Sequence, residues 1–323
     1  MLARYVGWGG IPQVFDGRNA DWEKEYTELK ELLPVKVYER ARGSTLNAHY
    51  TSKTVIDAIY AGLARMGFTD GTVLEPAAGT GNFIGLMPET FRKKVYGAEL
   101  DDITGGIAKY LYPNADIQIK GFEETDFPNN FFDGAVTNVP FGSYTVHDPK
   151  YNKYGVYIHD YFILKTLDKL REGGVAAIVT TKGTLDKQNA GARKLFAERA
   201  RLLGAVRLPN NAFKGNAGTE VTTDILFFKK TSETGERDAD WINIGADCNG
   251  VPVNGYYLSH PETVLGTMRK GASMYGSENE TYCEPDGRDL REALAEAVKN
   301  LPKSVYMPRA AKTAADKQTQ CEF

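Results

Sequence analysis

Short apolar segments alternate with helical stretches through the middle of the chain, and this alternation limits its possible folds most strongly. Seven runs are rich in β-branched, aromatic or other apolar residues: 73–74, 94–98, 117–119, 131–137, 175–180, 203–208 and 225–228. The pattern predicts βα units and a seven-stranded, mostly parallel sheet with helices on both faces. Because only a loop joins the last two runs and no helix follows the final one, we expect the final strand to insert antiparallel to its neighbours.

The chain ahead of this region has a different character. Charged residues with spaced apolar ones at 21–40 predict one amphipathic helix, preceded by an aromatic, glycine-rich loop at 5–10. Thr51 or Ser52 can cap a further helix that runs to Met66.

Composition excludes several classes of protein. The 323 residues are 42% hydrophobic and 25% charged, and no apolar run approaches the roughly 18 residues of a membrane span. No signal segment opens the chain, so a cytoplasmic location fits best. The cysteines Cys248, Cys283 and Cys321 are far apart with no CxxC pair, which indicates neither a metal site nor a disulfide framework.

The charge balance argues against a protein that coats nucleic acid by electrostatics alone, since the net charge is −3. Two local basic clusters remain candidates for such contacts: residues 182–194, and the segment around Arg207 and Lys214. Ordinary solvated faces are the alternative interpretation.

A candidate cofactor site lies where the first predicted strand ends. Its residues are an acid, a glycine turn and the start of a helix: Glu75, Pro76, Ala77, Gly79, Gly81, Asn82 and Phe83. Glycines lack a Cβ and let a bound nucleoside approach the backbone closely. The spacing departs from the dinucleotide pattern G-x-G-x-x-G, and G-x-x-x-x-G-K-[ST] does not occur. A nucleoside cofactor without phosphates is therefore preferred.

Two later strand ends extend this site. The second strand ends at Glu99 and Leu100, where an acid is placed to accept hydrogen bonds from ribose hydroxyls; capping of the next helix is the alternative role. After the third strand, Phe122 can flank an adenine ring and Glu123 can accept its amino hydrogens. Asp126, or ordinary loop chemistry, is the alternative there.

The fourth strand ends in the tetrapeptide Asn138, Val139, Pro140 and Phe141. An Asn side-chain oxygen and a main-chain carbonyl can together accept both hydrogens of an exocyclic amine, while an aromatic ring stacks on the base. Holding an amine in line with a methyl donor can remove roughly 7 to 11 kcal/mol of barrier. Together the two motifs predict a methyltransferase.

The segments EPAAGTGNF and NVPF resemble the cofactor and catalytic motifs of adenine-N6 DNA methyltransferases, (D/E)PxxGxGxF and (N/D)PP(Y/F). The resemblance implies a Rossmann-like class I fold and S-adenosylmethionine as the donor. By the same resemblance, Asn138 and the Val139 carbonyl hold the amino group, and Phe141 stacks on a flipped adenine. Val139 replaces a proline, which removes backbone rigidity and affects rate more than mechanism.

Three further groups of segments carry the resemblance. Tyr50 and Thr51 resemble the (Y/F)TP segment that closes over the methionine end of the cofactor. Residues 173–180, 207–213 and 219–230 resemble the closing strands of type I restriction modification subunits. Residues 5–10, 158–170 and 256–266 resemble the methylase region of helicase-methylase proteins of phages and conjugative elements. DNA of either strandedness, and a helicase domain or a separate helicase or specificity subunit, are the partners that this implies.

The chain is expected to have three parts. These are an N-terminal loop and helical segment (1–45), a methyltransferase catalytic domain (46–232), and a C-terminal extension with a helix at 289–301 and a frayed tail (233–323).

The loop at 142–160 carries four tyrosines beside the predicted base site: Tyr144, Tyr151, Tyr154 and Tyr157. Stacking on an extruded base is worth about 1 to 3 kcal/mol, so we favour a mobile substrate loop over a lid packed on itself. No catalytic role is assigned to His147 or His159.

Two alternatives stay open beside adenine methylation. A protein glutamine methyltransferase uses a similar clamp on a side-chain amide, but the endings RLPxxxF and TDILFFKK are unusual for that group. A catalytically weak or inactive methylase-like module could instead bind DNA or cofactor and serve a helicase. Val139, the acidic balance and the short region after Lys230 favour this second alternative.

Overall fold

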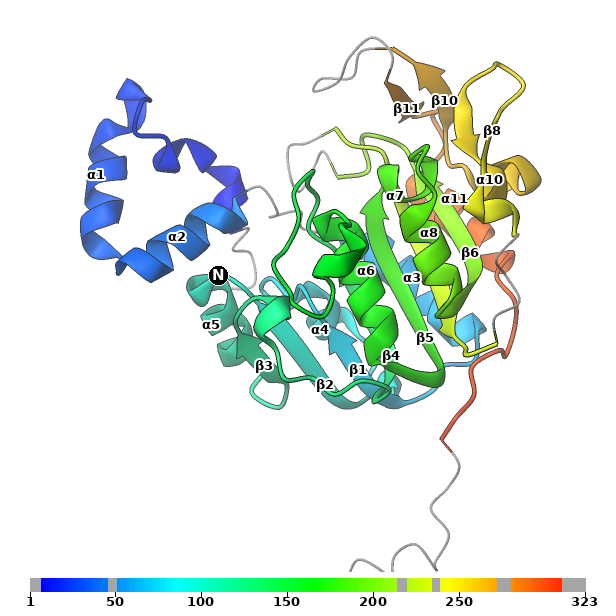
Figure 1. Ribbon diagram of the computed structural model, residues 1–323, viewed down its shortest axis with the longest axis horizontal. Helices are drawn as coiled ribbons and strands as arrows, with labels where there is room; N and C mark the ends of the chain where they lie inside the picture. The colour runs from blue at the N-terminus through cyan, green and yellow to red at the C-terminus, as the bar shows by residue number, and fades with distance from the viewer. Residues whose placement is uncertain (1–6, 46–50, 214–219, 234–238, 272–279, 310–323) are drawn as a thin grey trace, which may run out of the picture.

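The centre of the molecule is a seven-stranded sheet of order β3-β2-β1-β4-β5-β7-β6 (Figure 1). The computed structural model describes residues 7–45, 51–213, 220–233, 239–271 and 280–309. The sheet consists of β1 (Gly71–Glu75), β2 (Arg92–Glu99), β3 (Asp116–Ile119), β4 (Phe132–Asn138), β5 (Leu170–Thr181), β6 (Ala200–Leu208) and β7 (Thr223–Lys230). Strand β7 runs antiparallel to both β5 and β6, whereas the other pairings are parallel. All seven predicted strands and the antiparallel insertion are confirmed.

Helices cover both faces of this sheet because side chains alternate along each strand. Val73 belongs to one core cluster, together with residues of α3 (Lys53–Arg65), α4 (Asn82–Leu86), α5 (Asp102–Leu111) and α11 (Leu290–Lys299). Leu74 belongs to the other, with residues of α6 (Ile158–Lys169) and α8 (Gly191–Ala197). The short helix α7 (Gly183–Asp186) follows β5 directly. None of the described helices is long and apolar enough to cross a membrane.

The prediction of one continuous helix at 21–40 is wrong. The structure has two helices, α1 (Glu23–Leu32) and α2 (Val35–Ser44), with Pro34 at the start of the second. Proline lacks an N–H and pushes the preceding residue out of the helical region, and Leu33 is extended, with a φ of −98° and a ψ of 134°. Ahead of α1 lie three short 3-10 helices, Trp8–Gly10, Pro12–Phe15 and Ala20–Trp22.

The helix caps agree better with what the sequence predicts. Ser52 caps α3 by accepting a hydrogen bond from the backbone N–H of Val55, and Asp289 caps α11 in the same way through Glu292. Both predicted helices are confirmed. Buried residues of α11 share a core cluster with those of α3, so residues from after position 289 help to cover the sheet.

The C-terminal part contains more structure than its composition predicted. Two small hairpins are present, β8 (Ile244–Ala246) with β9 (Pro252–Asn254) and β10 (Thr267–Lys270) with β11 (Thr281–Glu284). Helix α10 (Gly255–Ser259) follows β9, and two 3-10 turns lie nearby at Asp240–Ile242 and Pro261–Thr263. Strands of three or four residues are too short to show a period of two, which explains why they were missed.

One buried carboxylate links three strands. Asp133 of β4 is 3% exposed and accepts hydrogen bonds from Thr72 N (2.8 Å) and Thr72 Oγ1 (2.7 Å). Arg171 Nε and Arg309 Nε each donate to Asp133 Oδ1 at 2.7 Å. Burial alone would raise the pKa of Asp133, but the bonds from Arg309, Thr72 and Arg171 lower it to about 2.

Asp133→Asn should lower the free energy of unfolding by about 3 kcal/mol at pH 7, because it removes the charge that compensates two guanidinium groups. The folded-state pKa of Asp133 lies below the unfolded value of about 3.9, so its stabilisation is present at neutral pH. It is lost as the pH falls from about 4 to about 2. Urea unfolding at pH 7 and pH 3 should therefore show a smaller difference between wild type and variant at pH 3.

Asp57→Asn is the matched control, since Asp57 pairs with Lys53 on the solvent-exposed face of α3. Such a pair contributes about 0.5 kcal/mol or less. Equal stability of the Asp133 and Asp57 variants at pH 7 would contradict the assigned role of Asp133.

Candidate active site

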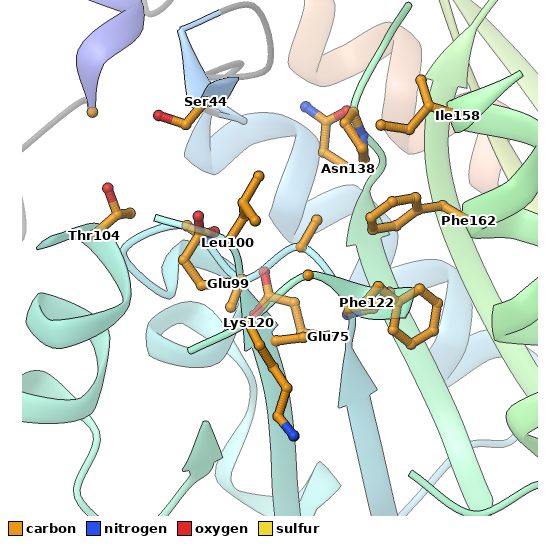
Figure 2. A pocket seen from close by; sticks show the side chains of 18 of the residues that line it. Ser44, Glu75, Glu99, Leu100, Thr104, Lys120, Phe122, Asn138, Ile158 and Phe162 are labelled. Atoms are coloured by element: carbon orange, nitrogen blue, oxygen red, sulfur yellow. Dashed lines mark hydrogen bonds between the residues drawn. The ribbon is translucent and has the colours of Figure 1, made fainter. Parts of the chain in front are cut away.

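A cavity of about 330 Å³ opens at the carboxyl ends of β1, β2 and β4 (Figure 2). This volume lies within the range of small-molecule sites in proteins. Most of the predicted cofactor residues and two residues of the tetrapeptide line it: Thr51, Glu75, Pro76, Ala77, Gly79, Asn82, Phe83, Glu99, Leu100, Phe122, Glu123, Asn138 and Pro140. The parallel register of β1 and β4 places both motifs at the same edge of the sheet.

The other predicted residues lie elsewhere. Gly81 caps α4 with a φ of 85°, and a Cβ there would meet the Tyr112 ring at 2.4 Å, so this glycine serves the turn and its packing. Val139 is 1% exposed and belongs to the core, whereas Phe141 lines a neighbouring cavity. Tyr50 lies outside the described residues.

Glu99 connects the glycine turn to the end of β2. Its Oε2 accepts a hydrogen bond from Gly79 N at 2.8 Å, and its Oε1 accepts one from Asp101 N at 2.9 Å. Asp101 is the residue that caps α5, through Thr104 N, so Glu99 is not the helix cap. Burial raises the pKa of Glu99 to about 7, although the backbone N–H groups of Asp101 and Gly79 oppose this shift.

Glu75 is a buried acid on the floor of the cavity. It is 1% exposed, and its Oε2 has no hydrogen-bond partner within the described part of the chain. Burial raises its pKa well above the ordinary value, and the nearby Glu99 adds to the shift. A buried polar atom without a partner on a cavity wall marks a place where a ligand supplies one. A cationic ligand would offset the cost of ionising this pair of acids.

The N-terminal segment forms a wall that the sequence did not predict. Ser44, at the end of α2, and Gly7 both line the cavity. Helix α2 is held there by Arg40, whose Nη1 lies 3.1 Å from Asp102 Oδ2 on α5. The remaining lining residues come from strand β2 and from several loops and helices: Ala78, Thr80, Ala98, Thr104, Lys120, Gly121, Tyr144, Thr145, Val146, Ile158 and Phe162. Ala78 and Thr80 belong to the EPAAGTGNF segment and Tyr144 to the tyrosine-rich loop. No local motif marks the others, because tertiary packing brings them together.

The loop after β3 carries the predicted contacts to the adenine of the cofactor. Phe122 and Glu123 line the cavity, with Phe122 on the side opposite Ser44 and Asn138 in Figure 2. Asp126 is exposed and pairs with Lys120 Nζ at 3.1 Å, outside the group of lining residues. The geometry therefore favours Phe122 and Glu123 over Asp126 as the cofactor contacts.

Asn138 and Val139 are both held by neighbouring elements. Asn138 Nδ2 donates to Thr51 Oγ1 at 3.1 Å, which joins the end of β4 to the segment just before α3. Val139 N donates to the carbonyl oxygen of Val179 on β5 at 3.0 Å. The backbone that would present the Val139 carbonyl is thus fixed by strand pairing.

The tyrosine-rich loop after β4 is packed down over part of its length. Tyr151 is buried and donates to Asp168, and Tyr154 OH accepts a hydrogen bond from Arg199. The buried Asp148 pairs with Lys165 Nζ at 2.8 Å. Tyr151 and Tyr154 are thus held by polar contacts and are not among the residues that line the two cavities. Tyr144 and Tyr157 do line cavities.

The structure also corrects the prediction that two basic clusters are candidates for contacts with nucleic acid. Arg193 and Arg207 are 1% and 0% exposed, because each guanidinium bonds to groups inside the protein. Lys182 and Lys187 line the cavity that Phe141 borders, and Lys214 lies outside the described residues.

The strand order, the glycine turn and the acids at the ends of β1 and β2 define a class I methyltransferase. The chain belongs to the N-6 DNA methylase family, whose model matches residues 33–251. Its cofactor is S-adenosylmethionine, and the glycine turn with the two buried acids fits a cationic nucleoside of this kind. The family match confirms the resemblance predicted from the two motifs.

Three individual proteins each resemble 63% to 67% of the chain. "Defense against restriction protein B" of Escherichia phage P1 is 30% identical over 211 residues, which are 63% of this chain and 9% of that protein. A Vibrio vulnificus structure assigned as a modification subunit of a type I restriction enzyme is 19% identical, with a TM-score of 0.48 over 67% of this chain and 49% of the other. A Listeria monocytogenes structure assigned as a class I S-adenosylmethionine-dependent methyltransferase is 14% identical, with a TM-score of 0.47 over 67% and 68%. These two structural likenesses concern the fold alone.

Glu99→Gln should weaken S-adenosylmethionine binding roughly tenfold or more, because a charged hydrogen-bond acceptor becomes neutral. Since the pKa of Glu99 is raised to about 7, wild-type affinity should increase between pH 6 and pH 8 as the carboxylate forms. The variant should lack this increase. Titration calorimetry at several pH values measures both effects.

Glu89→Gln, at an exposed position before β2, should leave the affinity and its pH dependence unchanged. An equally flat pH profile for wild type and both variants would refute a role for the Glu99 carboxylate in binding the cofactor.

Proposed function

We propose that this chain transfers a methyl group to the exocyclic N6 amino group of adenine in DNA. The observation that carries the proposal is the position of Asn138, which reaches the rim of the cofactor cavity from the end of β4. Membership in the N-6 DNA methylase family supports this acceptor over a protein amide.

Several residues would hold the cofactor. We assign the ribose hydroxyls to Glu99, and the adenine to Phe122 and Glu123. The turn at Gly79 lets the nucleoside approach the backbone, and Glu75 offers an unsatisfied carboxyl oxygen. The bound cofactor supplies a methyl group activated by a positively charged sulfur.

The tetrapeptide would position the acceptor. The Asn138 side-chain oxygen and the Val139 carbonyl accept the two amino hydrogens of a flipped adenine, which aims the nitrogen lone pair toward the cofactor cavity. Phe141 stacks on the base. Because both backbone and side chain are held in place before substrate arrives, catalysis depends on orientation, and no covalent nucleophile takes part.

We assign residues 46–232 as the catalytic domain and 1–45 and 233–323 as the segments that flank it. Ser44 of the first segment lines the cofactor cavity, and α11 of the second packs in the core. The proposed partners are DNA and a helicase domain or a separate helicase or specificity subunit. The small share of the phage protein that this chain matches supports a fused arrangement in relatives of that kind.

Asn138→Ala should reduce methyl transfer to DNA about 10²-fold or more, the usual effect of removing one orienting hydrogen-bond group. S-adenosylmethionine binding should change little. The assay uses labelled cofactor with single- and double-stranded unmodified DNA, followed by nucleoside analysis for N6-methyladenine. Asn114→Ala, on the exposed turn before β3, is the control.

Three outcomes would contradict the proposal. Transfer to a glutamine peptide but not to DNA would identify a protein methyltransferase. Cofactor binding without transfer to either acceptor, including with a helicase partner added, would identify a binding module. Full activity of Asn138→Ala would place the amine elsewhere.

A further inference from the structure

A second cavity, of about 560 Å³, adjoins the tetrapeptide on the side of Phe141. Its walls come from the loop after β4, the first turn of α6, the end of β5 with α7, the β6–β7 connection, and strand β11. Asn138 and Pro140 line the cofactor cavity, whereas Phe141 lines this one. A base held at Asn138 and stacked on Phe141 would therefore lie where the two cavities meet.

Two lysines provide positive charge in this cavity. Within the described part of the chain, neither Lys182 nor Lys187 forms an ion pair with a carboxylate. Lys187 Nζ lies 3.9 Å from the centre of the Tyr157 ring, and Lys182 Nζ lies 3.4 Å from Thr281 Oγ1 on β11. Contacts with a ring and a hydroxyl place both ammonium groups without neutralising them.

The acids of the cavity are distributed unevenly. Asp186 is engaged by the buried Arg207, whose Nη1 lies 2.6 Å from Asp186 Oδ2. Glu220 and Glu280 line the part formed by the β6–β7 connection and the start of β11. The side formed by α6, β5 and α7 carries both lysines. It also holds the buried Asp160 of α6, whose pKa burial raises to about 7 against the opposing charge of Lys187.

The aromatic and neutral groups suit a nucleotide. Phe141, Tyr157 and Tyr282 line the cavity with aromatic rings, the kind of group on which bases stack, and Lys187 lies over the Tyr157 ring. His159 also lines it and is 6% exposed. Burial, and then the charge of Lys187, lower the pKa of His159 to about 4, so its imidazole is neutral at pH 7 and does not repel or attract a phosphate.

We propose that the second cavity holds the DNA strand immediately beside the target adenine, with Lys182 and Lys187 as ligands of the flanking phosphates and Tyr282 against the neighbouring base. The inference rests on the proposed function, because it takes the acceptor to be a nucleotide held at Asn138. It assigns substrate binding to hairpin β10–β11, which follows the predicted catalytic domain in the sequence.

The test compares single-stranded oligonucleotides that carry one adenine, with either normal phosphates or uncharged methylphosphonates on both sides of it. Wild type, Lys182→Ala, Lys187→Ala and the double variant are measured for methyl transfer and for DNA affinity against salt. Lys109→Ala, on the exposed part of α5 at the other edge of the sheet, is the control.

Each lysine variant should raise the KM for normal DNA about tenfold, with kcat and S-adenosylmethionine affinity nearly unchanged. The slope of log affinity against log salt should fall by about 0.7 for each single-strand phosphate that the variant no longer neutralises. Methylphosphonates should weaken binding to wild type and to Lys109→Ala, but weaken it little further in the double variant. This coupling depends on the substrate charge, so a merely structural effect of the substitutions would not produce it.

Tyr282→Ala tests the second half of the proposal. The variant should change which bases are preferred beside the methylated adenine in a pool with randomised flanks, because a stacking wall is removed. Tyr110→Ala, which removes an exposed ring on α5, should leave the preference unchanged.

The results separate this inference from the proposed function. If wild type methylates DNA while the lysine variants match Lys109→Ala in KM, salt slope and methylphosphonate response, the phosphate site is refuted and the proposed function stands. An unchanged flank preference in Tyr282→Ala refutes the base contact. If wild type neither binds nor methylates DNA, both proposals fail together.

Discussion

A buried ion cluster centred on Arg207 determines how the C-terminal part of the chain meets the sheet. Arg207 is fully buried, and its Nε and Nη2 donate to the two carboxylate oxygens of Asp224 at 2.8 and 2.9 Å. Arg207 and Asp224 are direct partners in the β6–β7 pairing. Asp186 of α7 is the second carboxylate, and the Tyr257 ring of α10 lies 4.4 Å from the guanidinium carbon. Removing charges from water costs several kcal/mol for each ion, so the cluster is stable only when all its members are in place.

This cluster also positions elements that form the walls of the second cavity. Asp186 Oδ1 accepts a hydrogen bond from Asn254 N, which holds strand β9 against α7. Met268 of β10 contacts Arg207 through its sulfur. The lysines at either end of α7 and the hairpin that carries Tyr282 are therefore arranged by one set of buried charges. The endings RLP and TDILFFKK, which resemble type I modification subunits, contain the arginine and the aspartate of this pair.

The sequence predicted those features that depend on local pattern. Strand positions, the caps at Ser52 and Asp289, and the edge of the sheet that carries Glu75 and Asn138 all follow from periodicity, capping chemistry and parallel topology. The roles that the sequence did not predict depend on tertiary packing. In the sequence, Arg207 is assigned to a basic cluster. Only the fold shows that Asp224 and Asp186 bind its guanidinium. Ser44 reaches the cofactor cavity from α2, which packs on α5 with Arg40 paired to Asp102.

The valine in the tetrapeptide shows how a departure from a motif can preserve its physical role. A proline would fix φ through its ring, but it would also remove the N–H that bonds to Val179. Here that bond joins β4 to β5, and the Val139 side chain is 1% exposed in the core beneath the site. Rigidity thus comes from strand pairing and packing instead of from a ring. A valine keeps the same main-chain carbonyl that a proline would have at position 139, so the substitution by itself gives no physical reason to regard the site as inactive.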